Sequence, residues 1–198
     1  RQDMQLALYS IGDRAIESVL LAHERAIRQG GSTALRHRIE HAIMATPEQI
    51  ARAADMKLIF SVQPAYAYLW GGKGGMSERR VGERYLHSNN FAAMFAAGAV
   101  VCGGSDSDVT EPRPMLGIHA AVNRAVPQCA VSVEQAIEMY TVNGAYALFE
   151  DKRKGKLAPG YLADIVVLDR DIRTAPAEQL EQTDVTVTIQ SGSVLHRR

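Results

Sequence analysis

The sequence predicts an α/β fold built on a parallel sheet. Short apolar segments alternate with longer segments whose apolar residues recur every three or four positions, and this alternation repeats four times. Gly, Pro, Ser and Asp residues separate the segments. Strands that alternate with helices in this way indicate parallel pairing through right-handed crossovers.

The first unit is a strand over residues 5–9 followed by a helix over residues 15–28. Asp13 stands where the N-cap of that helix belongs, because a carboxylate there can accept from free backbone N–H groups. The apolar residues of the helix fall on one face. Gly30 ends the helix.

The second unit is a strand over residues 36–42 and a helix that opens at Thr46-Pro47. Thr46 is suited to the cap position, and proline is favoured at the first helical position because it needs no N–H partner there. The third strand covers residues 57–62, which are rich in β-branched and aromatic side chains.

Residues 64–87 interrupt this rhythm with several Gly and Tyr residues. We expect a mobile loop over the functional site here. The Gly-rich stretch at 71–75 lies in no strand–helix context and lacks the Gly-Lys-Ser/Thr ending of a phosphate loop, which disfavours a nucleotide-binding domain. A helix over 90–97 and a fourth strand over 99–103 follow.

Two more helices are predicted, over residues 114–125 and 132–149. Ser132 and Gln135 have the spacing of a capping box. The chain then changes character, because residues 160–168 and 185–195 resemble strands, the second interrupted by a tight turn at Ser191-Gly192. We therefore expect a β appendage at the C-terminal end instead of a fifth βα unit.

The composition is that of an ordinary globular protein. Hydrophobic residues make up 46% of the 198 residues, and 22 basic residues balance 22 acidic ones. The zero net charge gives no reason to expect a nucleic acid or a membrane as partner, and no apolar run approaches the roughly 18 residues of a membrane span. The chain begins with Arg1 and enters an apolar run almost at once, so we expect a missing segment before it.

The carboxyl ends of the predicted strands carry polar residues. In parallel α/β proteins these ends form the ligand site, which brings Tyr9, His41, Gln63 and Asp106 to one rim. His41 and Asp106 are suitable ligands for a divalent metal. A metal-activated water would then be the nucleophile, and Asp106 would accept its proton.

Each of these two residues also has a simpler structural interpretation. A single His after an apolar strand is often only hydrogen bonded in the protein, and Asp106 in Gly-Gly-Ser-Asp-Ser can shape a turn or cap a helix. Spacing alone leaves the structural and the metal-binding interpretations open.

Motifs along nearly the whole chain resemble those of the amidohydrolase superfamily, specifically its family 3 branch, in the same order. They are Tyr9-Ser-Ile-Gly-Asp-Arg-Ala15, Arg38-Ile-Glu-His-Ala42, Ser61-Val-Gln-Pro64, Gly104-Ser-Asp-Ser-Asp-Val109, Tyr140-Thr141 and Gly155-Lys-Leu-Ala-Pro-Gly-Tyr-Leu-Ala-Asp-Ile-Val-Val-Leu-Asp169. The resemblance implies the C-terminal half, strands 5 to 8, of a TIM-type (β/α)8 barrel with C-terminal β-sandwich strands. Residues 1–150 would be the half barrel of a metal-dependent hydrolase, and residues 151–198 the C-terminal β segment of a composite sandwich domain.

The resemblance also implies roles for the site residues. His41 corresponds to the sixth-strand metal ligand, and Asp106 to the eighth-strand ligand and catalytic base. Tyr9 stands where the family has the fifth-strand His, and a neutral phenol with a pKa of about 10 is a poor ligand, so the second metal position would be weakened or lost in this chain. One or two metal ions are implied for the complete enzyme. Gln63 and Tyr66 are expected, with Tyr9, to line the site, Tyr66 standing where many relatives have His.

The implied activity is hydrolysis of C–N bonds in small amide-type substrates by a water that a divalent metal, zinc, activates. The implied partner is the missing N-terminal half of the barrel or a second copy of the chain, because half a barrel has unpaired sheet edges. The alternative is a catalytically inactive structural fragment or subunit that needs a partner half barrel.

Overall fold

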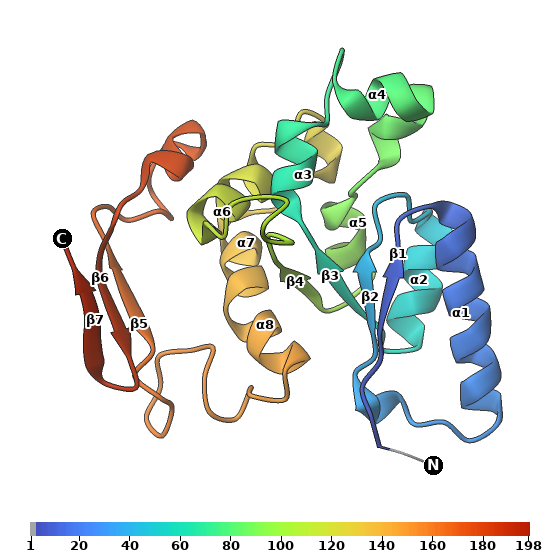
Figure 1. Ribbon diagram of the computed structural model, residues 1–198, viewed down its shortest axis with the longest axis horizontal. Coiled ribbons are helices and arrows are strands. Elements are labelled where there is room, and N and C mark those ends of the chain that lie inside the picture. Colours follow the sequence, from blue (N-terminus) through green and yellow to red (C-terminus); the bar gives the residue numbers. More distant parts are fainter. Residues whose placement is uncertain (1–2) are drawn as a thin grey trace.

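The computed structural model describes residues 3–198; residues 1–2, where a preceding segment is expected to join, lie outside the described part. Four parallel strands form one sheet in the order β1-β2-β3-β4 (Figure 1). The strands are β1 Ala7–Ser10, β2 Arg38–His41, β3 Ile59–Val62 and β4 Val101–Gly103. This arrangement confirms the α/β prediction and the four predicted strands, each of which begins two residues later than predicted.

Helices connect these strands. They are α1 Asp13–Arg28, α2 Pro47–Asp55, α3 Pro64–Leu69, α4 Met76–Val81, α5 Phe91–Ala96, α6 Pro114–Val122, α7 Val133–Tyr140 and α8 Val142–Ala147, with short 3-10 helices η1 Thr33–Leu35, η2 Gly82–His87, η3 Pro127–Cys129 and η4 Ala177–Gln182. The predicted capping box is present at the start of α7, where Ser132 pairs with Gln135. Thr46 caps α2 as predicted and also forms a capping box with Gln49.

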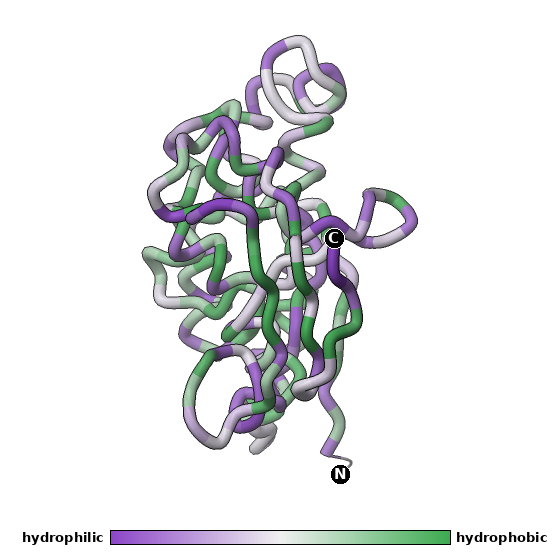
Figure 2. The backbone as a smooth tube through the Cα atoms, turned by 90° about the vertical axis from the view of Figure 1, so that its left-hand side faces the viewer, coloured by the Kyte–Doolittle hydropathy of each residue, from purple (hydrophilic) through white to green (hydrophobic). Residues whose placement is uncertain are grey.

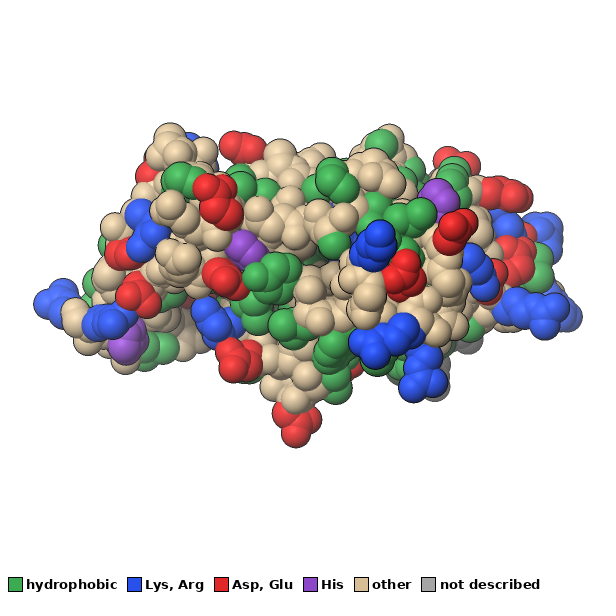
Figure 3. All heavy atoms as spheres, turned by 90° about the horizontal axis from the view of Figure 1, so that it is seen from above, with side chains coloured by type: hydrophobic (Ala, Val, Ile, Leu, Met, Phe, Trp, Pro, Cys, Tyr) green, Lys and Arg blue, Asp and Glu red, His purple; other side chains and the backbone are tan. Residues whose placement is uncertain are grey.

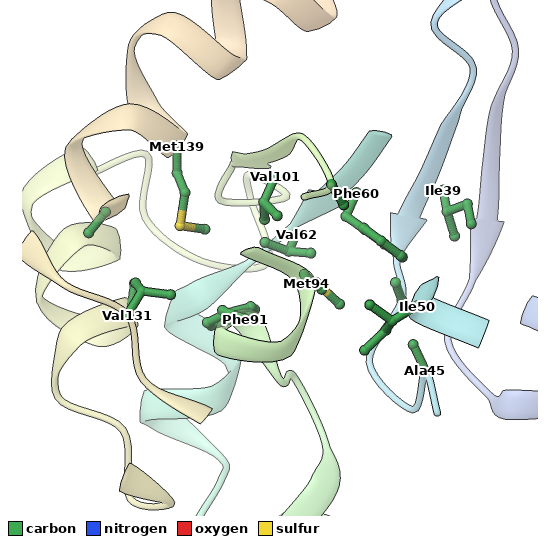
Figure 4. Close-up of a cluster of buried hydrophobic side chains, with 14 of the residues drawn as sticks. Ile39, Ala45, Ile50, Phe60, Val62, Phe91, Met94, Val101, Val131 and Met139 are labelled. Carbon is green, nitrogen blue, oxygen red and sulfur yellow. The ribbon is translucent and has the colours of Figure 1, made fainter. Parts of the chain in front are cut away.

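The core lies between one face of the parallel sheet and the helices. The register aligns Ile39, Phe60 and Val101 in one row across the sheet, and all three side chains are fully buried. They pack against Ile50 of α2 and Met94 of α5 (Figure 4). Side chains alternate between the two faces of a sheet, so the residues before and after each of these three point toward the opposite face.

The opposite face of the sheet carries a more polar row. The register aligns Tyr9, Glu40, Ser61 and Cys102 there. Glu40 forms an ion pair with Arg38 at 2.8 Å on the same strand. Tyr9 is 70% exposed. Most of the buried apolar side chains of the sheet therefore lie on the face that the helices cover, and few lie on the polar face.

Both cysteines are free and buried. Burial raises the pKa of the Cys102 thiol to about 11, and burial also raises the pKa of Cys129. Cys102 is a small core residue. No helix within residues 3–198 is long and apolar enough to cross a bilayer.

Three expectations about the helices are wrong. The segment 64–87 contains α3, α4 and η2, short helices that give too few turns for an apolar periodicity to appear. The N-cap residue of α1 is Gly12; Asp13 is the first helical residue, and its side chain pairs with Arg84 at 2.7 Å. The predicted helix over 132–149 breaks at Thr141, whose φ of −128° and ψ of −95° are not helical.

A second sheet follows as a separate layer. Its antiparallel strands are β5 Ile165–Leu168, β6 Val185–Gln190 and β7 Ser193–Arg197, in the order β5-β6-β7. Ser191 and Gly192 join β6 to β7, both with positive φ, as a two-residue hairpin turn requires. The sheet lies at the end of the long axis opposite to α1 (Figure 1), and hydrophobic residues occur along its strands (Figure 2). The predicted β appendage is confirmed.

Candidate functional site

The carboxyl ends of the parallel strands meet at one rim. The register places Ser10 opposite His41 at the ends of β1 and β2, and Val62 opposite Gly103 at the ends of β3 and β4. The residues that follow these ends therefore lie together above the sheet, on the side that Figure 3 views from above. Charged side chains of both signs are interspersed on this side of the molecule (Figure 3).

Within residues 3–198, the side chain of His41 has one hydrogen-bond partner, Gln63. Its Nδ1 lies 2.7 Å from Oε1 of Gln63, and both residues are only 6% exposed. An amide oxygen only accepts, so Nδ1 of His41 carries the proton and donates it. The other ring nitrogen, Nε2, is then the one with a free electron pair. His41 also has a φ of 73°, a left-handed backbone conformation that a non-glycine residue rarely adopts.

Aromatic rings surround the imidazole of His41. Tyr9 meets it edge-on, with ring centroids 4.7 Å apart, and Tyr66 stacks with it at 6.2 Å. Trp70 packs in turn against Tyr66, with centroids 4.6 Å apart. The structure brings Tyr9, Gln63 and Tyr66, the residues expected to line the site, together beside His41.

Tyr66 also reaches the second candidate ligand. Its hydroxyl donates to Oδ2 of Asp106 at 2.6 Å. Burial, with the hydrogen bond and charge of Asp106, raises the pKa of the Tyr66 phenol, so the phenol keeps its proton and remains a donor. Asp106 has a φ of 53°, so it also adopts the left-handed conformation.

The donor set for a metal ion is partial. Within residues 3–198 no group of three or more His, Cys, Asp or Glu side chains is arranged to hold an ion. Of the two predicted ligands, a neutral His41 that donates from Nδ1 leaves Nε2 for a metal, and the Asp106 carboxylate has a second oxygen, Oδ1, beside the one that Tyr66 binds, so each has one donor atom to offer. A complete centre needs further ligands from outside these residues.

A cavity of about 220 Å³ lies beside the Tyr66–Asp106 pair. Ala65 and Ser105, the residues that precede Tyr66 and Asp106, both line it, and Tyr140 forms part of its wall. The cavity offers room for a small organic group next to the candidate ligands.

The sequence prediction did not include Trp70 or Arg84. Trp70 follows Tyr66 by four residues, a spacing that places two side chains on one helix face, but the segment was not expected to be helical. Arg84 pairs with Asp13 across 71 residues, and no local pattern signals such a contact.

Residues 1–196 match the sequence profile of the amidohydrolase family. The chain belongs to this family, in its family 3 branch. The resemblance found in the motifs is thereby confirmed.

Curated relatives extend the match. The chain is 30% identical to the N-substituted formamide deformylase of Arthrobacter pascens over 98% of its own length and 37% of that protein's. It is 33% identical to the protein LONG AFTER FAR-RED 3 of Arabidopsis thaliana over 85% of its own length and 30% of that protein's. The chain therefore spans about a third of the length of these relatives.

Solved structures share the fold. A crystal structure of an uncharacterized metal-dependent hydrolase from Pyrococcus furiosus superimposes with a TM-score of 0.73 and 28% identity, over 86% of this chain and 34% of the other. This likeness supports the α/β prediction and the relationship to metal-dependent hydrolases.

Proposed function

We propose that this chain is part of a metal-dependent hydrolase that cleaves C–N bonds in small amide-type substrates. The observation that carries the proposal is the connected set at the rim, in which His41 ends β2, Asp106 follows β4 and Tyr66 contacts both. The metal-dependent hydrolase of known structure and the formamide deformylase among the relatives support the reaction class.

In this proposal His41 holds the ion through Nε2, and Asp106 holds it through its carboxylate. Imidazole and carboxylate suit zinc, the ion we propose. A divalent ion bound there supplies Lewis-acid activation of water. The Asp106 carboxylate accepts a proton as general base, and Tyr66 keeps the orientation of that carboxylate by donating to Oδ2.

Tyr9 bears on the number of ions. It stands at the position of a family His, and its phenol is a poor ligand at neutral pH. Its ring makes a T-shaped contact with the ring of His41, so the side chain lies at the site. A phenol there does not offer a metal ion the nitrogen electron pair that a histidine would. We propose that Tyr9 weakens a second metal position.

We further propose that the four parallel strands are strands 5 to 8 of the family barrel. Residues 1–150 are then the half barrel, and residues 151–198 belong to the composite sandwich. The missing N-terminal half, or a second copy of the chain, supplies the remaining ligands. The partial donor set within residues 3–198 equally favours the alternative, a catalytically inactive fragment that needs a partner half. A monomer of 21.6 kDa in solution would count against a barrel closed by two copies.

The test is hydrolysis of a panel of N-substituted formamides and acyl amides by the complete gene product. His41→Ala and Asp106→Asn should each lower kcat/KM at least about 100-fold, because each removes a group that acts on the reacting atoms. His87→Ala and Asp55→Asn, exposed residues of the same types, are matched controls and should leave activity unchanged. Activity retained in either site variant would sink the assignment of that residue, whereas an inactive wild type would favour the structural alternative.

A further inference from the structure

The corner between β3 and α3 touches both candidate metal ligands. β3 lies between β2, which ends in His41, and β4, which leads to Asp106. Gln63 directly follows β3 and binds His41, while Tyr66 in the first turn of α3 binds Asp106. Two residues three positions apart therefore reach ligands that are 65 residues apart in the chain.

We propose that this β3–α3 corner is the positioning element of the metal centre, in which Gln63 orients His41 and Tyr66 orients Asp106. The inference rests on the proposed function and adds two positioning residues to it. Metal-ligating histidines and carboxylates generally need such hydrogen-bonded partners, which fix the orientation of the ligand and its protonation.

Gln63 determines which nitrogen of His41 is available. Because Oε1 of Gln63 accepts from Nδ1, the electron pair of the ring is on Nε2. Both side chains are buried, and a hydrogen bond in such surroundings is stronger than one in water. Without this acceptor, the proton of the neutral ring could lie on either nitrogen.

Tyr66 determines the orientation of the Asp106 carboxylate. Within the part of the chain that the structure describes, the Tyr66 hydroxyl is the one hydrogen-bond donor to that carboxylate. The Tyr66 ring is itself fixed on two sides, by the stacked imidazole of His41 and by Trp70. The phenol therefore holds the carboxylate from a well-packed position.

The corner is locally stiff. Pro64 occupies the first helical position of α3, where its ring fixes φ. The backbone N–H of Tyr66 donates to the carbonyl oxygen of Gln63 at 3.1 Å. Gln63 and Tyr66 are thus held at a fixed separation by the backbone. Because each of them binds one candidate ligand, this separation also limits the distance between His41 and Asp106.

The experiment measures metal affinity instead of turnover. Zinc dissociation constants are determined on the complete gene product by competition with a chromophoric chelator, and the visible spectrum of the cobalt-substituted protein reports the ligand geometry. Tyr66→Phe keeps the ring and removes the donor; Gln63→Met keeps the length and removes the acceptor. Each should weaken zinc binding about 10- to 100-fold and shift the cobalt spectrum.

Two further variants separate positioning from folding. Gln63→Glu keeps an acceptor for Nδ1 of His41 and should restore affinity close to that of the wild type. Tyr68→Phe removes the hydroxyl of another tyrosine of α3, whose ring lies against His119, and should change neither affinity nor spectrum. Thermal unfolding of every variant checks that the fold is retained.

The outcomes distinguish this inference from the proposed function. If His41→Ala and Asp106→Asn abolish zinc binding while Tyr66→Phe and Gln63→Met bind as the wild type does, the corner has no positioning role and the proposed function stands. If zinc binding is absent from the wild type, or is indifferent to His41→Ala and Asp106→Asn, both proposals fall.

Discussion

The two sheets of this protein use similar residues in opposite surroundings. In the parallel sheet, the apolar row that includes Phe60 is completely buried beneath helices. In the antiparallel sheet, β7 is exposed along its whole length, and Leu195 is 63% exposed. Antiparallel sheets normally cover one face with a core. Apolar residues therefore occur in the strands of both regions, but within residues 3–198 the row of Phe60 is covered by helices and β7 is not.

The largest expected effect tests this contrast directly. Phe60→Ala should lower the free energy of unfolding by about 3–5 kcal/mol, because it leaves a cavity in a filled core. Leu195→Ala in β7 should cost less than about 0.5 kcal/mol, since its side chain is largely in water already. Urea unfolding followed by circular dichroism measures both. A large cost for Leu195→Ala would mean that another surface covers the antiparallel sheet in solution.

An intermediate effect on the free energy of unfolding is expected from one serine in each region, Ser132 at a helix cap and Ser191 in a hairpin turn. The Ser132 hydroxyl accepts from the backbone N–H of Gln135 and caps α7, so Ser132→Ala should cost about 1 kcal/mol. Ser191 in the β6–β7 turn is the matched control, because no hydrogen bond of its hydroxyl is found within residues 3–198. Ser191→Ala should cost less than about 0.5 kcal/mol. Equal costs in the same unfolding assay would refute the special role of the capping box.

The smallest expected effect is a pH dependence confined to the first region. Burial, and then the nearby His23, lower the pKa of His37 from 6.5 in the folded protein. The unfolded chain then binds a proton more readily than the folded one, so stability from this group is complete above pH 6.5 and is lost as the pH falls below it.

His37→Gln should therefore flatten the decline of unfolding free energy below pH 6.5. Gln can still accept from the backbone N–H of Leu6, as Nδ1 of His37 does. His196→Gln on the exposed strand β7 should leave the pH profile unchanged. An identical slope in wild type and His37→Gln would show that His37 does not carry the effect.

Local chemistry explains which parts of the fold could be predicted. Thr46 and Ser132 satisfy helix N–H groups three residues away, so their role is visible in a few residues of sequence. The break at Thr141 and the helices of 64–87 depend on packing against distant segments. Position 141 is a threonine and not a proline or glycine, so the sequence there does not predict that the helix breaks.

The candidate site divides in the same way. The rule for strand ends brought His41, Gln63 and Asp106 to one rim from sequence alone. It could not say that Tyr66 bridges His41 and Asp106, because that depends on the direction in which α3 leaves β3. The family motifs indicated His41 and Asp106 as candidate ligands, and the three-dimensional structure shows that Tyr66 contacts both.

Because both thiols are buried, their alkylation can be used to measure local unfolding of the protein. Alkylating reagents attack the thiolate, and Cys102, with a pKa of about 11 and little exposure, offers almost none in the native state. Cys129 is fully buried near η2, while the antiparallel strands contain no cysteine. The rate of alkylation therefore measures transient opening of the parallel-sheet region. It does not report local unfolding of β5 to β7.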